Sequence, residues 1–263
     1  MVDINIEQHF RSDEVPFLES MDGLVGRVQN EYRDLLTDFL NPRQQFILQT
    51  IVNRYEGVKL RFFGGFETSE MKRALIYPDY FEPQQTDFQV SAYTIDYPQK
   101  FATLSHGQIL GSLMGSGIER EIIGDIITDG TNWQFMVKTE MATYVANQLD
   151  HIGKVKIRLK PVPLDQLLTP NQEFETVTTT VSSLRLDVIL AEGAHISRHH
   201  AKELVEAGRV RVNWSENQRP DYELGVSDIV SVRGFGRIIL VEVGGMTKKD
   251  KIRVTLNLIK PNK

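Results

Sequence analysis

Hydrophobic residues recur at helical spacing along the first 55 residues of the chain. Residues 16–40 place their apolar positions on one side of a helix, and the next segment opens with Asn41 and Pro42. Asn41 is a favourable N-cap, and Pro42 suits the first helical position because its missing N–H would have no partner there. VKLRFF, a polar turn and RALIYP follow, a pattern consistent with two short strands around a short helix. Residues 1–83 are therefore expected to form a helical region with a short α/β segment.

From residue 84 to residue 165 the pattern predicts strand, helix, strand, strand, helix and strand. The two adjacent strands, EIIGDIIT and NWQFMVK, are joined by a turn that contains Asp129 and Gly130. In the helix after them, five apolar residues and one glutamine form a single stripe: Met141, Tyr144, Val145, Gln148, Leu149 and Ile152. This order is that of a ferredoxin-like, RRM-like split βαβ domain. NWQFMVK lacks the glycine and aromatic signature of RNA-recognition motifs, so base stacking on this sheet is not expected.

The last strand of this domain has a charged face. Cations alternate with aliphatic residues along it, so four cations share one side: Lys154, Lys156, Arg158 and Lys160. Two interpretations fit the pattern. Either the strand is half-buried with a solvated face, or the like charges, which repel one another unless acids or an anion lie between them, form a second RNA-binding face.

Residues 163–181 contain two prolines and a threonine-rich run, which are typical of a connector that includes a short strand. We place a linker at 166–181 and a C-terminal α/β domain at 182–263. The predicted fold class is α+β, with a helical N-terminal region, the ferredoxin-like domain and this small C-terminal domain.

The formal net charge of −5 hides an asymmetry between the two ends of the chain. Residues 1–181 contain 16 Lys and Arg against 25 Asp and Glu, a net −9, whereas residues 182–263 contain 14 against 10, a net +4. An acidic body with a basic terminal domain indicates a polyanionic partner for that domain, and a chance imbalance gives the same totals. The positions of the cations have to decide between the two.

Composition excludes several classes of protein. The 263 residues include no cysteine, so disulfides and thiolate chemistry are excluded. No run of about 18 apolar residues is present, and the first residues lack the basic and apolar parts of a secretory signal. We therefore expect a cytoplasmic protein without a membrane partner.

The cations of the C-terminal domain gather in SRHHAKELVEAGRVRVNW, residues 197–214. Ser197 is expected to cap a helix that ends at Gly208, a residue suited to the left-handed position after a helix. Arg198 and Lys202 are four residues apart and are neighbours on its exposed side. The opposite side of this helix is expected to face the core with three residues: Ala201, Leu204 and Val205.

A first helix, SLRLDVILAE, precedes this segment, and Arg185 lies at its start. After Gly208 the strand RVRVN is expected to turn Val210 and Val212 inward and Arg209 and Arg211 outward. The cations can therefore converge where two helices meet a strand.

The stretch RLDVILAEGAHISRHHAKELVEAGRVRVN resembles the alpha-L RNA-binding motif of the ribosomal small-subunit protein of the S-four type. It has R-L-D, an apolar helix, S-R, a helix with Ala and Leu, and G-x-V-x-V-N, within about residues 183–230. With VNW, RPDYEL and RGFGR beyond it, the whole chain is similar to the YlmH family of ribosome-associated proteins. Trp214 stands where the general motif has glycine, so a different turn is expected there.

This resemblance implies a domain that grips structured RNA. The positions that carry over as RNA contacts are Arg185, Ser197, Arg198, Lys202 and Arg209. Arg211 is added from strand alternation alone. Guanidinium groups pair with phosphate oxygens through two hydrogen bonds, and the helix end at Ser197 adds backbone donors. The resemblance also implies ribosomal RNA or tRNA on the large subunit as partner, rescue of stalled subunits and a link to cell division.

No catalytic residue, metal site or cofactor is expected. His199 and His200 are adjacent on a helix and point about 100° apart, so they cannot easily chelate one ion. HIGK and MTKKD faintly echo the ATP-binding signatures of tRNA synthetases, but no nucleotide-binding fold surrounds them. FFGGF lacks the lysine of a phosphate loop. Asp187 has the R-L-D context of a pseudouridine synthase aspartate, yet within this motif it is expected to cap or pair locally.

Three functional hypotheses remain. The first is a non-catalytic RNA-binding factor. The second is an adaptor that binds a protein partner through its acidic N-terminal region and is anchored by RNA. The third is an RNA-modifying enzyme, for which no nucleophile and base can be named.

Overall fold

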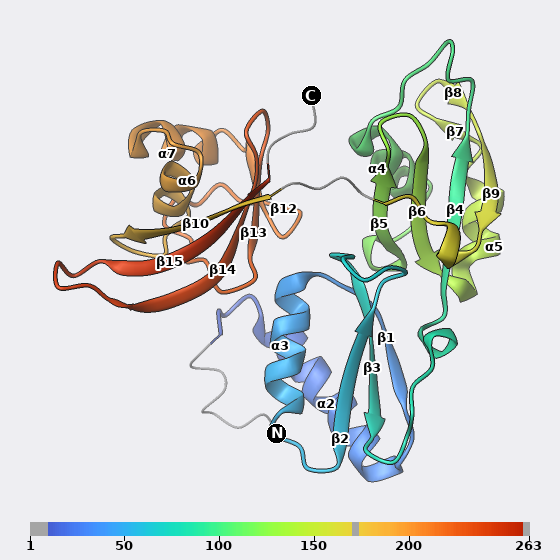
Figure 1. The fold of residues 1–263 in the computed structure, drawn as a ribbon, viewed down its shortest axis with the longest axis horizontal. Helices are drawn as coiled ribbons and strands as arrows, with labels where there is room; N and C mark the ends of the chain where they lie inside the picture. The colour runs from blue at the N-terminus through green and yellow to red at the C-terminus, as the bar shows by residue number, and fades with distance from the viewer. Residues whose placement is uncertain (1–9, 170–173, 260–263) are drawn as a thin grey trace. The chain divides into compact units, whose positions relative to one another are not determined.

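The chain folds into two compact units, Met1–Asn171 and Gln172–Lys263 (Figure 1). The computed structural model describes residues 10–169 and 174–259. Both units mix helices with strands, which confirms the predicted α+β class. In the described part of the chain no helix is long and apolar enough to cross a membrane.

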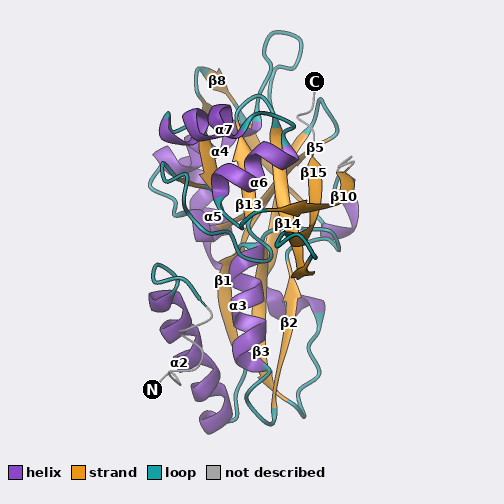
Figure 2. Cartoon of the chain, turned by 90° about the vertical axis from the view of Figure 1, so that its left-hand side faces the viewer, coloured by secondary structure: helices purple, strands orange, loops and turns teal. Residues whose placement is uncertain are grey.

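The first half of the N-terminal unit is a three-stranded antiparallel sheet covered on one face by two helices (Figure 2). The strands, in the order β1-β3-β2, are β1 (Leu35–Leu40), β3 (Lys72–Pro78) and β2 (Val58–Phe63). The helices are α2 (Val15–Glu31) and α3 (Pro42–Val52). The apolar stripes of both helices pack on β3, so helical periodicity and burial agree here.

The helix expected to run through residues 16–40 is wrong in its last part. α2 ends because Tyr32 adopts a left-handed backbone with φ 54°, and Leu35–Leu40 pairs with β3 as a strand. Pairing along β3 decides this segment, since Phe39 and Leu40 are both buried there. Between β2 and β3 the chain forms turns, so no short helix lies there. The capping of α3 is confirmed, because Asn41 Oδ1 accepts from the Gln44 N–H at 2.9 Å.

The second half of this unit has the predicted split βαβ order. Its sheet, β5-β6-β4-β9, is antiparallel throughout. The strands are β4 (Val90–Asp96), β5 (Ile123–Thr128), β6 (Trp133–Lys138) and β9 (Arg158–Val162), and the helices are α4 (His106–Gly115) and α5 (Thr139–Gln148). Short elements complete the unit: β7 (His151–Ile152), β8 (Val155–Lys156), and the 3-10 helices η1 (Gln85–Phe88), η2 (Arg120–Ile122) and η3 (Leu164–Gln166). In α5 the buried face is Ala142 and Val145, whereas Tyr144, predicted to be apolar core, is 45% exposed.

The two halves, expected as separate domains 1–83 and 84–165, are joined by close contacts. Asp125 on β5 accepts hydrogen bonds from the backbone N–H groups of Glu70 at 2.6 Å and Met71 at 3.0 Å. At Gly124 a Cβ atom would lie 2.9 Å from the Phe39 ring, so only glycine allows β5 to approach β1 this closely.

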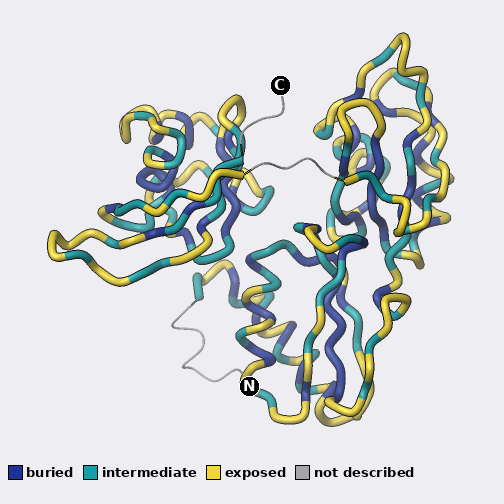
Figure 3. The backbone as a smooth tube through the Cα atoms, viewed as in Figure 1, coloured by how far each residue is buried: buried dark blue, intermediate teal, exposed yellow. Residues whose placement is uncertain are grey.

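The C-terminal unit is a six-stranded sheet with two helices on one face. Its strand order is β10-β15-β14-β13-β11-β12, and neighbouring strands are antiparallel. The strands are β10 (Phe174–Val181), β11 (Val210–Val212), β12 (Ser215–Glu216), β13 (Ile229–Val232), β14 (Gly236–Met246) and β15 (Ile252–Ile259), and the helices are α6 (Leu186–Gly193) and α7 (Arg198–Glu206). The core lies between sheet and helices, where Figure 3 shows buried backbone.

The strand expected within the connector is confirmed as β10, and it belongs to the C-terminal unit, which begins before the boundary expected at residue 182. Phe174–Val181 pairs with β15 along its whole length, from Phe174 opposite Ile259 to Val181 opposite Ile252. The threonine-rich run forms this strand because β-branched residues favour extended backbone and suit a half-exposed sheet edge.

Candidate functional site

Two of the predicted arginines meet on one buried carboxylate. Arg185 is the N-cap residue of α6, and Arg198 is the first residue of α7. Arg185 Nε donates to Asp187 Oδ1 at 3.0 Å, and Arg198 Nε donates to Asp187 Oδ2 at 2.9 Å. Asp187 is 2% exposed, whereas the Arg198 side chain is 56% exposed. A buried acid therefore fixes two guanidinium groups while much of their surface stays open to solvent.

The two arginines stabilise the charged form of Asp187. Burial acts to raise the pKa of Asp187, but the hydrogen bonds and positive charges of Arg185 and Arg198 outweigh burial and lower it. The hydrogen bond between Arg185 and Asp187 also raises the pKa of Arg185. Asp187 is thus ionised near neutral pH, and two guanidinium groups on one carboxylate give the cluster a net positive charge.

Helix α7 has the predicted caps and faces. Ser197 Oγ accepts a hydrogen bond from the His200 N–H at 3.1 Å, and Gly208 has the predicted left-handed backbone with φ 68°. The predicted core face is also confirmed, because three residues are buried: Ala201, Leu204 and Val205. Lys202 is exposed one turn after Arg198, and its Nζ lies 3.6 Å from Glu206 Oε1. The exposed side of α7 thus carries two cations close to its N-terminus.

The other two predicted arginines, Arg209 and Arg211, lie in different places. Arg209 lies three residues after the end of α7, and its N–H donates to the Leu204 carbonyl at 3.0 Å, so it stays next to the end of that helix. Arg211 lies on β11 between Val210 and Val212, whose side chains belong to the core beneath α6 and α7. Because side chains alternate along a strand, Arg211 points to the sheet face without helices. The exposure of Arg211 is as predicted, but the structure does not bring it to the other cations.

The turn after β11 keeps a left-handed backbone at the position where glycine was replaced. Asn213 has φ 49° and Trp214 has φ 68°, the pattern of a two-residue type I′ hairpin turn between β11 and β12. The expectation that this turn differs from that of the general motif stays a prediction. The Asn213 amide holds this turn in place, because it donates to buried Asp228 Oδ1 at 2.7 Å and accepts from the Ile229 N–H at 3.0 Å.

The basic strand predicted at 154–160 is divided into two pieces. β8 pairs with β7, and β9 pairs with β4, because the chain breaks at Ile157, whose N–H donates to the Asp150 carbonyl at 2.9 Å. The predicted alternation of exposure is confirmed, since all four cations are exposed and Ile157 is buried. Lys160 Nζ lies 2.6 Å from Asp96 Oδ2. The other three cations form no ion pair with any residue that the structure describes.

The segments considered for other chemistry have structural roles. His199 and His200 both lie beside the same acid, Glu203, at 3.4 and 3.3 Å. HIGK forms the β7–β8 hairpin with Gly153 at its turn, and MTKKD forms the tip between β14 and β15. Neither segment lies next to a nucleotide-binding fold.

One contact within this cluster was not predicted from the sequence. Asp187 was expected to pair locally, which is confirmed, but its bond to Arg198, eleven residues away, was not predicted. The R-L-D and S-R pairs were visible signals. The packing of α6 against α7 brings these two pairs together, and their spacing in the sequence does not predict that packing.

Comparison with known proteins agrees with these two units. The profile of the family described as putative RNA-binding domain in YlmH matches residues 83–166, and that of the S4 domain matches residues 184–230. The chain is 41% identical over 251 residues to the ribosome-associated protein quality control protein P2 of Bacillus subtilis (strain 168), covering 95% of this chain and 97% of that protein.

A solved structure is also similar. The cell division protein ylmH from Streptococcus pneumoniae matches with a TM-score of 0.54 and 34% sequence identity, over 61% of this chain and 98% of that one. Together with the profile matches and the extent of the B. subtilis alignment, this confirms the family resemblance predicted from the motifs. The chain belongs to the YlmH family, with the putative RNA-binding domain of that family in its N-terminal unit and an S4 domain in its C-terminal unit.

Proposed function

We propose that the C-terminal unit clasps structured RNA through the α6–α7 surface, defined as Arg185, Ser197, Arg198, Lys202 and Arg209. The observation that carries this proposal is that buried Asp187 holds two arginines, of which Arg198 is exposed and Arg185 is partly exposed. A guanidinium group whose position is already fixed loses less entropy when it binds a phosphate, so the cluster is prepared for an anion. The helix end capped by Ser197 adds partial positive charge at the same place.

Contacts of this kind determine what the surface can recognise. Phosphate and sugar contacts provide affinity through release of counterions, and they carry no base identity. Discrimination therefore comes from the shape of a folded RNA, as it does for most double-stranded RNA recognition.

The proposal extends to ribosomal RNA or tRNA on the large ribosomal subunit, in a non-catalytic role in the cytoplasm. The similarity to a protein named for ribosome-associated quality control supports a function in the rescue of stalled subunits. The name of the solved structure supports a link to cell division. The four cations of 154–160 are proposed as a second, weaker RNA-binding face, supported by their exposure.

Substitution of single arginines tests the α6–α7 surface. Arg198→Ala and Arg209→Ala should each weaken binding to a structured RNA hairpin by about 1–3 kcal/mol, the size of a charge-assisted contact. Each should also reduce the slope of log affinity against log salt by about one unit. Fluorescence anisotropy over a salt series measures both quantities. Arg253→Ala is the matched control, because Arg253 is an exposed arginine of β15 outside this surface.

Unchanged affinity of both variants, with circular dichroism spectra like that of the parent protein, would reject the surface. The RNA partner needs a separate measurement. Crosslinking in cells followed by sequencing of the attached RNA should recover large-subunit RNA and tRNA, with recovery lowered by Arg198→Ala. Crosslinks confined to messenger RNA would contradict the ribosomal part of the proposal.

A further inference from the structure

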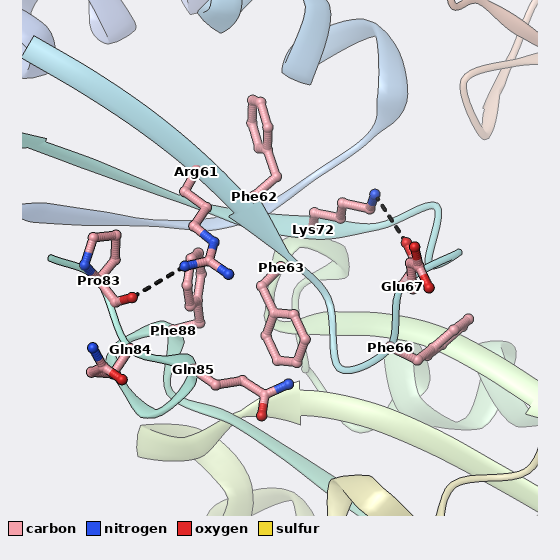
Figure 4. Close-up of a pocket in the computed structure, with 10 residues that line it drawn as sticks. All are labelled: Arg61, Phe62, Phe63, Phe66, Glu67, Lys72, Pro83, Gln84, Gln85 and Phe88. Carbon is pink, nitrogen blue, oxygen red and sulfur yellow. Dashed lines mark hydrogen bonds between the residues drawn. The ribbon is translucent and has the colours of Figure 1, made fainter.

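A cavity of about 570 Å³ lies in the N-terminal unit, where β2 and β3 meet the segment that leads into β4 (Figure 4). Its volume is within the range of small-ligand sites. The residues that define its chemistry are Arg61, Phe63, Phe66, Lys72, Gln85 and Phe88. Aromatic rings, two cations and an amide therefore line one hollow, which no part of the proposed function uses.

The FFGGF sequence at residues 62–66 builds one wall of this cavity. A Cβ atom on Gly64 would lie 2.5 Å from Ser69 Oγ. Gly65 has φ 110°, and a Cβ atom there would lie 2.8 Å from Met136 Cγ on β6. Both positions therefore require glycine, and the loop is held against the ferredoxin-like half of the unit. Since the Ser69 hydroxyl also donates to the Phe66 carbonyl at 2.8 Å, the loop presents its aromatic residues in a fixed position.

The aromatic residues form a rigid, partly open platform. Phe88 is 1% exposed, and its ring packs against Phe63 with centroids 5.5 Å apart. Figure 4 shows the Phe63 ring between the Arg61 guanidinium and Phe66, while Phe62 points the other way. Phe63 and Phe66 are partly exposed and line the cavity, so aromatic surface remains open to a ligand there.

The polar side chains that line the cavity beside these rings have hydrogen-bond donors left for a ligand. Arg61 is exposed and donates one hydrogen bond, to the Pro83 carbonyl at 3.1 Å. Lys72 Nζ lies 3.4 Å from the Glu67 carbonyl. The Gln85 amide makes no hydrogen bond with the residues described. The carboxylate of Glu67 also lines the cavity, so two cations face one acid. A ligand with a flat polar ring and a negative group matches this set.

We propose that this cavity binds one unpaired nucleotide of a single-stranded RNA segment. Its base would stack on Phe63, its phosphate would meet the Arg61 guanidinium, and Gln85 would hydrogen-bond the edge of the base. Phe66 and Lys72 line the other end of the cavity. Stacking on aromatic side chains is the common way in which proteins hold unpaired bases. The site is distinct from the α6–α7 surface, which the proposed function assigns to folded RNA.

The test compares two probes that differ only in their bases: hexaadenylate and a six-unit ribose-phosphate chain without bases. Electrostatic contacts anywhere on the full-length chain contribute to both, so the ratio of the two affinities reports on stacking. The parent protein should bind hexaadenylate about tenfold more tightly, the scale of one stacked base. Phe63→Leu, which keeps an apolar contact with Phe88, should bring this ratio close to one, and Phe66→Ala should lower it less.

Matched variants separate the cavity from general effects of charge and exposed rings. Arg61→Glu should weaken hexaadenylate binding more than Lys59→Glu, which makes the same change of charge two residues earlier on the same strand and outside the cavity. Phe101→Ala removes a ring that is 90% exposed elsewhere in the unit and should leave the ratio unchanged.

Three outcomes would overturn the proposal. They are an equal affinity of the parent protein for the two probes, a ratio that survives Phe63→Leu, and binding of free AMP as tight as that of hexaadenylate. Equal affinity for the two probes would mean that the cavity binds another class of ligand, such as a peptide. Tight binding of AMP would mean that it binds a free nucleotide. Hairpin binding measured in parallel keeps the two proposals apart, because cavity variants should retain it and Arg198→Ala should retain the hexaadenylate ratio.

Discussion

Asp125 in the N-terminal unit and Asp187 in the C-terminal unit are both largely buried, yet their pKa values move in opposite directions. Burial is the largest influence on each and favours the neutral acid. With Glu70 nearby, it raises the pKa of Asp125 to about 6, against the weaker effects of two backbone N–H groups and Arg120. For Asp187, the hydrogen bonds and charges of two arginines outweigh the effect of burial and lower the pKa.

The difference shows what each buried acid does. Asp125 accepts hydrogen bonds from the loop that carries FFGGF at its start, so it joins the two halves of one unit. Asp187 binds side chains that remain exposed, so it orients charge for a partner. Backbone dipoles are enough to position a carboxyl group, whereas full positive charges are needed to keep it ionised when it is buried.

The largest expected effect is a pH dependence of the N-terminal unit. Folding raises the pKa of Asp125 from 3.8 to about 6, so the folded state holds this proton more tightly than the unfolded chain. The stability it contributes is present below the unfolded value and is lost as pH rises through about 6, by at most about 3 kcal/mol. Asp125→Asn should remove this part of the slope between pH 4 and pH 6.

Urea unfolding in a Trp214→Phe background measures this effect, because Trp133 then reports on the N-terminal unit alone. The comparison is between pH slopes, since asparagine offers one acceptor to the two N–H donors and changes absolute stability as well. Asp165→Asn, at an exposed acid of the same unit, is the control. An Asp125→Asn slope equal to that of the parent would mean that Asp125 is ionised throughout, like Asp187.

The next effect concerns Asp187. Asp187→Asn should lower the free energy of unfolding of the C-terminal unit by about 1–3 kcal/mol at pH 7, because charge-assisted bonds to two arginines are lost. Folding lowers the pKa of this acid, so its contribution is present above the unfolded value of 3.8 and is lost as pH falls. The difference between the variant and the parent should therefore shrink below about pH 4.

Trp214 fluorescence in a Trp133→Phe background follows this unit. Glu242→Gln is the control, because Glu242 is an exposed acid on β14 of the same unit, and exposed acids contribute little to stability. If Asp187→Asn costs no more than the control, the two arginines are not held by the acid, and the contrast with Asp125 fails.

The smallest effect tests cations that no buried acid holds. Lys154 and Lys156 are exposed on a two-strand hairpin, and replacing both with alanine should weaken hairpin RNA binding by only about twofold. Flexible lysines that are not oriented beforehand lose more entropy on binding than the clamped arginines. The salt series used for Arg198→Ala measures this loss. A loss equal to that of Arg198→Ala would make 154–160 an RNA face of the same weight.

Sequence reasoning predicted elements well where local signals and burial agree. The Asn41 and Ser197 caps, the left-handed Gly208 and the core face of α7 follow from neighbouring residues, and each is confirmed. Errors arose where pairing with a distant segment decided the outcome. Leu35–Leu40, expected as helix, pairs with β3, and Phe174–Val181, expected as part of a linker, pairs with β15 in the C-terminal unit.

The sequence by itself determined which residues are cationic, which face of each C-terminal element is apolar, and to which family the chain belongs. It could do so because caps, periodicity and motif spacing depend on residues a few positions apart. Only the tertiary structure decided that Arg185 and Arg198 share Asp187, that Arg211 points to the other face of the sheet, and that FFGGF walls a cavity. Those facts depend on which distant segments pack together, and packing satisfies buried polar groups and fills space in ways that local spacing does not encode.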